Sequence, residues 1–394
     1  MRISDNVSEI QPSATMAVAA LARELRAQGR DIIDLSAGEP DFRTPDFIAQ
    51  AGIAAIQNGQ TRYTPPPGLP ELRQAIAESM ARRYGRPMDP RGVVVSAGAK
   101  QALFNACFVL FGPGDRVLIP APYWTSYPEI VKLARAEPVV VPTREERGFK
   151  LTTEDLDAAW SEGVRGLMLN SPSNPAGVVY SRDDLKEIMD WASKRDVWVI
   201  SDEIYSRIHF ADGPAPGLLD LGPEVLERAV IIDGASKGFA MTGWRIGFSY
   251  TDPALAGHIS ALQSHTTSNA ASPSQHAAIA AYSAEPLEEE GITRMAEVFQ
   301  QRRDLLLDLF REQLPEVEYI RPEGAFYLFF RVDGYFKGDI ADSVSFCRDI
   351  LDRAGVALVP GAAFGDDRYV RLSFAASEQA LEQGVARLTE ALHG

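Results

Sequence analysis

Short apolar runs alternate with segments of helical periodicity along the middle of the chain, and this alternation limits the possible folds more than any other feature. Ser181 and Asp184 have the spacing of a helix capping box, and apolar residues recur at helical spacing over 102–111. Strands that alternate with helices favour an α/β fold with a largely parallel sheet. The predicted strands are VVVS (93–96), VLIP (117–120), PVVV (138–141), GLMLN (166–170), VWVIS (197–201) and AVIID (229–233).

The pattern changes in the last quarter of the chain, where a long charged amphipathic helix is expected over 291–314. We expect a large domain over 46–285, with a mixed, mostly parallel sheet flanked by helices, and a smaller α+β domain formed by 1–45 and 286–394. Because no Gly/Ser-rich linker occurs, the long helix is expected to join the two domains. The strands predicted after this helix are AFYLFFR (325–331), VALVP (356–360) and YVRLSF (369–374).

Composition excludes several classes of partner. The chain has 394 residues and a net charge of −15, so long-range repulsion disfavours nucleic acids and anionic membranes. An anionic ligand therefore has to meet cations that the fold places locally. Cys107 and Cys347 are far apart in sequence, and a buried free thiol is favoured over a disulfide or a metal ligand for Cys107. With no signal-peptide pattern and no membrane-length apolar run, a cytoplasmic location is expected.

Polar residues follow several predicted strands, and open α/β sheets bind ligands beyond the carboxyl ends of their strands. Asn174, Asp202 and Lys237 each occupy such a position. A lysine amine forms Schiff bases with carbonyl cofactors, an arginine such as Arg245 holds a phosphate, and a carboxylate pairs with a protonated pyridine nitrogen. With Tyr205 and Asn174 as donors to a phenolate oxygen, these residues indicate pyridoxal phosphate. Taken singly, Lys237 also fits a solvated turn, and Asp202 also fits a helix cap.

Three further features add candidate ligands, each with a plainer structural alternative. Ser96, Gly98 and Ala99 turn from a strand into a helix whose first amides can cradle a phosphate, although most helix N-termini bind water or a capping side chain. Trp124 is suited either to stack on a ring or to fill the core. Arg371 alternates with the apolar residues of its strand, so it faces either a cleft, where it can hold a substrate carboxylate, or solvent.

In chain order, these motifs resemble those of the class I aminotransferases, which have the fold-type I pyridoxal-phosphate architecture, and particularly the bacterial aspartate and prephenate aminotransferases. The likeness extends over nearly the whole chain. The segments that carry it are SAGEPDFRTP (36–45), YTPPPGLPELR (63–73), SAGAKQALFNA (96–106), APYWTSYPE (121–129), NSPSNPAG (170–177), SDEIY (201–205), GASKGFAMTGWRIG (234–247), GAFY (324–327) and VRLSFAASE (370–378).

The resemblance implies a role for each residue around the cofactor ring. Lys237 would hold pyridoxal 5'-phosphate as a Schiff base and would act with Asp202 and Tyr205 in catalysis. Asp202 would pair with the ring nitrogen, Tyr205 and Asn174 would contact the ring hydroxyl, and Trp124 would stack on the ring.

The resemblance also implies a carboxylate site and a phosphate site. Arg371, with Asn174, the Gly38 backbone and the neighbouring Trp124, would bind the amino acid substrate by its α-carboxylate. Family members often have a cis bond at the position of Asn174–Pro175. One phosphate ligand would come from the partner, so the active form would be a homodimer with its sites at the subunit interface. The phosphate ligands would be the backbone amides of Gly98, Ala99 and Lys100, the side chains of Ser236 and Arg245, and Tyr63 of the partner subunit.

The chain departs from the family pattern at two positions. Gly234 stands three residues before the lysine, where serine is common, so Ser236 is left as the side-chain hydroxyl for the phosphate. Gln11 replaces a lysine that often precedes the PSAT segment, so the resemblance does not extend to prephenate recognition. Lys100 matches the lysine that these enzymes direct at the distal carboxylate of aspartate or glutamate; the alternative is a solvated lysine in the first turn of a helix.

The expected activity is transfer of an amino group from an L-amino acid, aspartate or glutamate, to a 2-oxo acid by a ping-pong mechanism. Alternatives on the same fold are a preference for aromatic or other amino acids, a β-lyase, and a regulatory module, whose DNA-binding domain this chain lacks. Neither a P-loop nor an H-E-x-x-H motif occurs, so no nucleotide or metal is expected. A more remote alternative is a hydrolase, in which GASKG is a nucleophile elbow around Ser236 and the base is His258, His265, His276 or His393.

Overall fold

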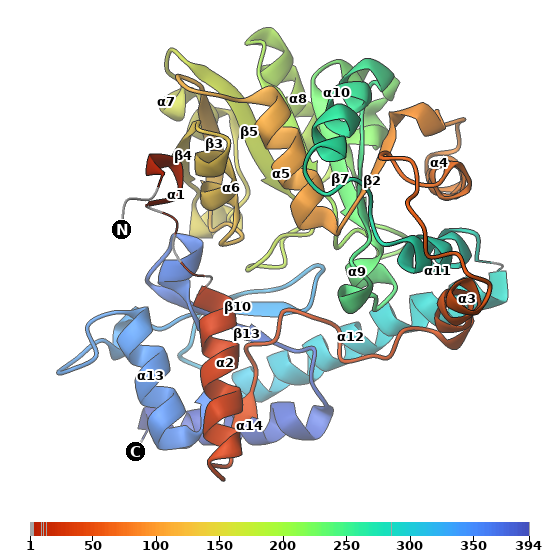
Figure 1. Ribbon diagram of the computed structural model, residues 1–394. Helices are drawn as coiled ribbons and strands as arrows, with labels where there is room; N and C mark the ends of the chain where they lie inside the picture. The colour runs from red at the N-terminus through yellow and green to blue at the C-terminus, as the bar shows by residue number, and fades with distance from the viewer. Residues whose placement is uncertain (1–3, 9, 11, 13, 285, 394) are drawn as a thin grey trace.

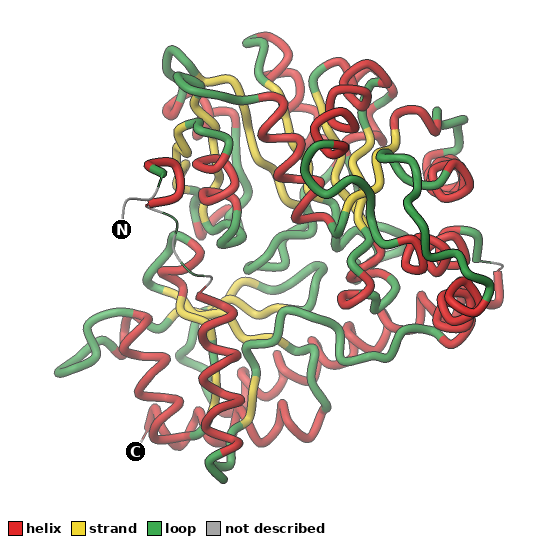
Figure 2. The backbone as a smooth tube through the Cα atoms, viewed as in Figure 1, coloured by secondary structure: helices red, strands yellow, loops and turns green. Residues whose placement is uncertain are grey.

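The computed structural model describes residues 4–8, 10, 12, 14–284 and 286–393. In this part of the chain a larger sheet lies above a smaller one in the view of Figure 1, and helices pack around both. Figure 2 shows that loops, not regular elements, occupy most of the region between the two sheets.

The larger sheet has seven strands within the described residues, in the order β4-β3-β5-β6-β7-β8-β2. Neighbouring strands are parallel except that β8 runs antiparallel to both β7 and β2. All six apolar runs form strands here, so the prediction of an α/β fold with a largely parallel sheet is confirmed. The strands are β2 (Val93–Ser96), β3 (Arg116–Ala121), β4 (Glu137–Pro142), β5 (Val164–Asn170), β6 (Trp198–Asp202), β7 (Ala229–Gly234) and β8 (Gly247–Tyr250).

Side chains of the central strands alternate between two helical layers, because successive residues of a strand point to opposite faces. On β3, Val117 and Ile119 pack with α5 and α6, whereas Leu118 packs on the other face with α7 and α8. Helix α8 begins at the predicted capping box, in which the Asp184 amide donates to Ser181 Oγ at 3.1 Å. The layers are α5 (Ala99–Leu110) and α6 (Tyr127–Leu133) on one face, and α7 (Thr153–Ala159) and α8 (Arg182–Lys194) on the other.

Further helices pack around the β2 and β8 edge of this sheet, where α4 and α10 contact β2 and where α11 packs on α3 and α4. These longer helices are α3 (Asp46–Gln57), α4 (Pro70–Tyr84), α10 (Pro253–Ser264) and α11 (Ser272–Tyr282). The short ones are α9 (Ala235–Gly238), η1 (Pro90–Gly92), η2 (Glu145–Arg147), η3 (Leu218–Leu221), η4 (Pro223–Glu227) and η5 (Thr242–Trp244).

The smaller sheet is antiparallel, in the order β12-β13-β10-β9, and a separate parallel pair joins β1 to β11. Its apolar residues pack against α12, α13 and α14 in a second core. The strands are β1 (Ile33–Asp34), β9 (Tyr319–Ile320), β10 (Tyr327–Arg331), β11 (Val356–Ala357), β12 (Val359–Pro360) and β13 (Tyr369–Ser373). The helices of this part are α2 (Ala14–Ala27), α12 (Pro286–Gln313), η6 (Asp333–Tyr335), α13 (Ser343–Ala354), η7 (Gly361–Phe364) and α14 (Glu378–His393), whereas the short α1 (Asp5–Ser8) lies against α6 of the larger part.

Helix α12 belongs to both cores. Ile292, near its start, packs in the core of the larger sheet, whereas Phe299 and Phe310, further along, pack in the core of the smaller one. The helix therefore joins the two parts, as expected from its length and from the lack of a linker. The exact domain boundaries, 46–285 against 1–45 with 286–394, stay a prediction. In the described part of the chain every helix is too short or too polar to cross a bilayer.

Close backbone packing gives a first testable prediction. A Cβ atom at Gly247 of β8 would lie 2.1 Å from the amide nitrogen of Ala99, at the start of α5. Since backbone has little room to yield, we expect Gly247→Ala to lower the free energy of unfolding by about 1–3 kcal/mol, the usual cost of overpacking. Urea denaturation measures this change.

The matched control is Gly257→Ala on α10, where a Cβ atom would meet nothing within 4 Å. Alanine is the better helix former, so this variant should be more stable than the parent by about 0.5–1 kcal/mol. Equal effects of the two substitutions would contradict the proposed packing of β8 against the start of α5.

Candidate active site

A cavity of about 490 Å³ opens beyond the carboxyl ends of β5, β6 and β7, where residues of both sheets meet. This volume is ample for a cofactor with a small substrate. Most of the predicted site residues lie together on its wall. The predicted residues that line it are Gly38, Ala99, Lys100, Trp124, Asn174, Asp202, Tyr205, Ser236, Lys237, Arg245 and Arg371.

Lys237 projects into the cavity from α9, the short helix that follows β7. Its Nζ donates a hydrogen bond to the backbone oxygen of Gly38 at 2.5 Å. Burial lowers the pKa of Lys237 to about 8; the Glu39 carboxylate opposes this shift, and the Arg371 and Arg245 guanidiniums add to it. The fraction of the amine that is neutral and nucleophilic near neutral pH is therefore far larger than for an ordinary lysine, which does not fit the alternative of a solvated turn lysine.

Asp202 ends β6 and is buried. Its Oδ2 accepts a hydrogen bond from the Tyr127 hydroxyl at 2.7 Å, and its Oδ1 accepts one from the Ile204 amide at 3.2 Å. Burial raises the pKa of Asp202 to about 6, while the hydrogen bond from Tyr127 limits the rise. The carboxylate is therefore ionised at neutral pH and is suited to pair with a cationic ring nitrogen.

Tyr205 lies on the loop after β6, in the core of the smaller sheet. Its hydroxyl is 2.9 Å from the hydroxyl of Tyr327 on β10. Burial raises the pKa of Tyr205 well above its usual value, so the hydroxyl keeps its proton and can donate a hydrogen bond. This contact brings the larger and the smaller sheet together at the cavity.

Arg371 is 1% exposed, which rules out the alternative of a solvated strand face. Its guanidinium donates to Asn174 Oδ1 at 3.0 Å and to the Ser36 backbone oxygen at 2.8 Å. The same group lies 4.3 Å from the centre of the Tyr327 ring and 5.1 Å from that of Phe364. The two hydrogen-bond partners and the two rings hold the guanidinium in place on the cavity wall, where it can bind a carboxylate.

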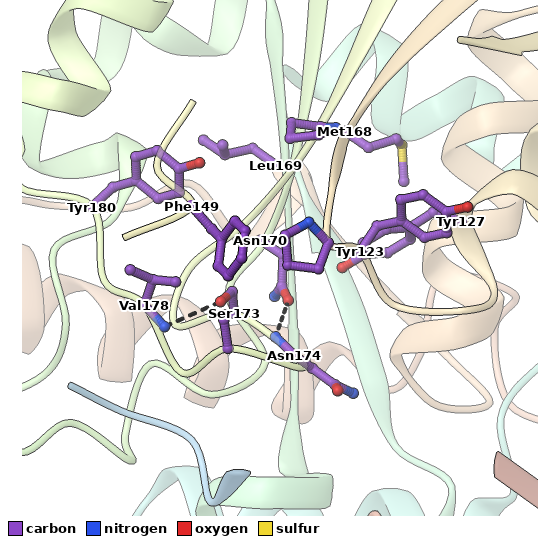
Figure 3. Close-up of a pocket in the computed structure, with 13 residues that line it drawn as sticks. Tyr123, Tyr127, Phe149, Met168, Leu169, Asn170, Ser173, Asn174, Val178 and Tyr180 are labelled. Atoms are coloured by element: carbon purple, nitrogen blue, oxygen red, sulfur yellow. Dashed lines mark hydrogen bonds between the residues drawn. The ribbon is translucent and has the colours of Figure 1, made fainter. Parts of the chain in front are cut away.

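Asn170, at the end of β5, fixes the loop that carries Asn174. Its side-chain amide donates to the Asp202 backbone oxygen at 2.9 Å and accepts from the Asn174 backbone amide at 2.8 Å. Figure 3 shows the second of these bonds beside a small cavity of about 30 Å³, which also adjoins Tyr127. The Asn174–Pro175 bond is cis, as the resemblance implies.

An anion cradle lies at the N-terminus of α5. Gly98 has φ +88°, and a Cβ atom there would lie 2.3 Å from Nη2 of Arg245. Arg245 itself has a left-handed backbone, φ 59°, and donates to the Thr242 and Ala97 backbone oxygens at 3.0 and 3.2 Å. A helix N-terminus beside a guanidinium and the hydroxyl of Ser236 offers the hydrogen-bond donors and the positive charge that a phosphate requires. The residues therefore fit pyridoxal phosphate.

The glycine at position 234 has a steric reason. Gly234 pairs with Gly247 across β7 and β8. A Cβ atom at Gly234 would lie 2.8 Å from Cα of Gly247 and 2.9 Å from the Ile246 backbone oxygen. Serine would therefore require the two strands to separate at this point, and Ser236 remains the hydroxyl of this turn that lines the cavity.

The outer part of the cavity carries two more cations. The Lys100 ammonium lies 4.9 Å from the centre of the Trp124 ring, which in turn packs edge-on against Tyr127. Burial lowers the pKa of Lys100, and the nearby charge of Arg245 lowers it further. Arg23 of α2 lines the same cavity. Lys100 is thus a wall residue of the site and not a first-turn lysine directed away from it.

Two of the predicted phosphate ligands, Gly98 and Tyr63, are not among the described residues that line the cavity. Tyr63 is 92% exposed and does not line the cavity of its own chain. Gln11 lies outside the described residues.

Several cavity residues were missed by the sequence reasoning. Tyr127 and Tyr327 lie inside the segments that carry the family resemblance, and Asn170 ends a predicted strand, so position alone was a usable signal for these three. No such signal existed for α2, because helical spacing does not tell which surface a helix will cover. Its residues on the cavity wall are Thr15, Met16, Ala19 and Arg23.

A mostly parallel sheet with a lysine beyond β7 and a buried carboxylate beyond β6 defines the class of pyridoxal-phosphate-dependent enzymes of fold-type I. The chain matches the model of the family aminotransferase class I and II over residues 30–388. The protein belongs to this family.

Similar proteins agree over the full length. An aspartate aminotransferase of Geobacillus stearothermophilus is 41% identical, over 98% of this chain and 98% of that protein. A probable aspartate/prephenate aminotransferase of Aquifex aeolicus is 38% identical, over 99% of this chain and 98% of that one. The solved structure of an aspartate aminotransferase from Thermus thermophilus with maleate has a TM-score of 0.93 at 37% identity and covers 100% of both chains. The protein is therefore a pyridoxal-phosphate-dependent aminotransferase that acts on amino acids and 2-oxo acids.

The lowered pKa of Lys237 makes a testable prediction about cofactor capture. Only the neutral amine attacks an aldehyde, so the rate at which the apo-protein captures pyridoxal phosphate should rise with pH and level off above about pH 8. Stopped-flow absorbance at a series of pH values measures this rate. Because Glu39 raises this pKa, Glu39→Gln should move the midpoint to lower pH. A midpoint near the ordinary value of 10.5 would contradict the assignment.

Proposed function

We propose that this protein transfers the amino group of L-aspartate or L-glutamate to a 2-oxo acid, through two half-reactions in one site. The observation that carries the proposal is the position of Lys237 in one cavity with an ionised carboxylate, Asp202, and a buried carboxylate-binding guanidinium, Arg371. Lys100 adds a second cation on the same wall.

The residues proposed to hold the cofactor divide into two groups. Asp202, Tyr205 and Asn174 would face the ring, and Trp124 would stack on it. Bound pyridoxal phosphate supplies an electron sink that eases removal of the substrate Cα proton, and it stores the amino group between the half-reactions. The phosphate would be held by the amides of Gly98, Ala99 and Lys100 and by the side chains of Ser236 and Arg245.

The chain's own residues then position the substrate and move its proton. Arg371, Asn174 and the Gly38 backbone would hold the α-carboxylate, so that Cα lies beside Nζ of Lys237. That amine, whose pKa burial lowers to about 8, takes the proton from Cα when it is in its neutral form. Tyr205 keeps its own proton and acts as a hydrogen-bond donor throughout.

Substrate choice is proposed to depend on Lys100. An ammonium in the cavity that also holds the α-carboxylate site favours a side chain that ends in a carboxylate over an apolar or aromatic one. Similar proteins that are named aspartate aminotransferases support this choice.

We also propose that the active form is a homodimer and that Tyr63 of the partner subunit completes the phosphate site. The support is the 92% exposure of Tyr63 on a loop that hydrogen bonds anchor on both sides, together with the large apolar side chains that are exposed on α3, Ile53 and Ile56. The two cysteines of the chain, Cys107 and Cys347, are free and buried, which suits the reducing cytoplasm.

The hydrolase alternative lacks its base. Among the described residues that line the cavity there is no histidine to activate Ser236. A β-lyase remains a distinct outcome, because it would use the same cofactor site and release ammonia.

The test is a single-turnover half-reaction. Purified holoenzyme mixed with L-aspartate or L-glutamate alone should lose its visible absorbance and form one equivalent of 2-oxo acid, and a 2-oxo acid should then restore the absorbance. Parallel initial-rate lines would show the ping-pong pattern. Release of ammonia, or turnover that needs both substrates together, would contradict the proposal.

In Lys237→Ala the cofactor should still bind, and turnover should fall by at least three orders of magnitude.

The specificity prediction concerns Lys100→Met, which removes the charge and keeps the length of the side chain. We expect kcat/KM for aspartate to fall about tenfold or more, the cost of one charged hydrogen bond, with little change for alanine. Alanine is the internal control because it lacks the distal carboxylate. If Arg23→Met changes the aspartate-to-alanine ratio and Lys100→Met does not, the distal carboxylate is recognised from α2 instead.

A further inference from the structure

Two glutamines outside the cavity have an unusual setting. Gln263 on α10 and Gln275 on α11 are both fully buried, and both face the loop over residues 58–69 that carries Tyr63. Burial of a side-chain amide is costly unless its donors and its acceptor form hydrogen bonds. The hydrogen-bond partners of each glutamine therefore show which segments of the chain it holds in place.

Gln263 uses all four hydrogen-bonding positions of its side chain. Its Nε2 donates to the backbone oxygens of Pro66 at 2.5 Å and Val95 at 2.8 Å. Its Oε1 accepts from Ser96 Oγ at 2.6 Å and from Asn105 Nδ2 at 3.0 Å. One amide thus ties the Tyr63 loop to the strand end that leads into the phosphate cradle.

Gln275 binds the same loop at two other points. Its Nε2 donates to Thr64 Oγ1 at 2.9 Å and to the Ala270 backbone oxygen at 2.8 Å, and its Oε1 accepts from the Leu69 amide at 2.8 Å. The Ser272 hydroxyl adds a bond to the Gln60 backbone oxygen at 2.8 Å.

The loop is therefore anchored on both sides of Tyr63, whose own side chain is 92% exposed. Gly68 closes the loop with φ +102°, and a Cβ atom there would lie 2.8 Å from the Val95 side chain. Buried amides fix the backbone of this loop, and one large aromatic side chain remains exposed on it. The loop therefore loses its conformational entropy on folding and not on contact with a partner, so Tyr63 is preorganised for binding.

We propose that Gln263 and Gln275 are positioning residues, whose buried amides hold the loop over residues 58–69 so that Tyr63 meets the phosphate cradle of a second copy of this chain. The inference rests on the proposed homodimer. It makes each subunit responsible for part of the other's affinity for pyridoxal phosphate. Gln263 touches both the loop that is given to the partner and the strand end that leads into the chain's own cradle, whereas Gln275 touches the loop and Ala270.

The experiment uses mixed dimers in which one subunit carries Lys237→Ala. Borohydride fixes the cofactor to Lys237 only, so the trapped fraction at each pyridoxal phosphate concentration reports the single site that keeps this lysine. Gln275→Met removes the amide and keeps the length of the side chain. Placed on the Lys237→Ala subunit, it should weaken capture about tenfold, the loss expected for one hydrogen bond to a charged group. Placed on the other subunit, it should have no effect.

Gln263→Met should weaken capture of pyridoxal phosphate whichever subunit carries it, because Gln263 contacts both the Tyr63 loop and the strand end that leads into the phosphate cradle. In a Tyr63→Phe background, Gln275→Met should cause no further loss, since a residue that acts through another is not additive with it. Thr64→Val, which removes the hydroxyl partner of Gln275 from the exposed loop, provides the same readout if Gln275→Met does not fold. Gln74→Met is the matched control: this glutamine is exposed and donates only to Glu78 of its own helix.

Two results would overturn the positioning role while leaving the homodimer intact. In the first, Gln275→Met weakens capture of pyridoxal phosphate equally in the two placements. In the second, it weakens capture only when it is placed on the subunit that keeps Lys237. If Tyr63→Phe has no effect on capture in either placement, the proposed part of Tyr63 in the partner's site fails, and the inference falls with it.

Discussion

The buried charge of Arg371 sets the geometry of the whole site. A guanidinium enclosed by protein is costly unless its donors are satisfied, and the cost of an unpaired charge is several kcal/mol. Here Nη1 donates to Asn174, on the loop after β5, and Nη2 donates to the Ser36 backbone, on the segment after β1, while Nε is buried without a partner among the described residues. The charge is therefore stabilised only when the larger sheet, the smaller sheet and the N-terminal segment come together, and the cavity lies where they do.

The charge of the cavity is opposite to that of the molecule. The whole chain has a net charge of −15, yet five cations and only three carboxylates line the cavity. Three of these cations, Lys100, Lys237 and Arg245, line the cavity, and Lys237 is the most enclosed of the three. The fold thus concentrates scarce positive charge at one point, and this is the local placement that an acidic chain requires in order to bind a phosphate and two carboxylates.

The sequence predicted the large sheet and most of the polar residues at its edge, because both depend on local pattern. Lys237, Asp202 and Asn174 were found from their positions after strands, a rule that needs no knowledge of the smaller sheet. Arg371 was found as a candidate, but a solvated strand face remained the alternative. Strand periodicity indicates on which face of the sheet a side chain lies, and it does not indicate what covers that face. Tyr127 was overlooked although it lies in a segment that carries the family resemblance, and α2 was not found because the surface that a helix covers arises from packing.

The sequence pattern also could not explain why glycine stands at position 234, where serine is common in the family. The reason for Gly234 lies on another strand, in the backbone of Gly247 and Ile246, and only the paired register of β7 and β8 reveals it. The same limit applies to the two buried glutamines, which are unremarkable in sequence and acquire a role only from the loop that they hold.

Helix α12 has a consequence for how the molecule unfolds. At about 1.5 Å per residue its 28 residues extend over about 42 Å, and its side chains contribute to both hydrophobic cores. Loss of either core would expose apolar side chains of a helix that the other core still needs. We therefore expect the two parts to melt as one cooperative unit, although each has its own sheet.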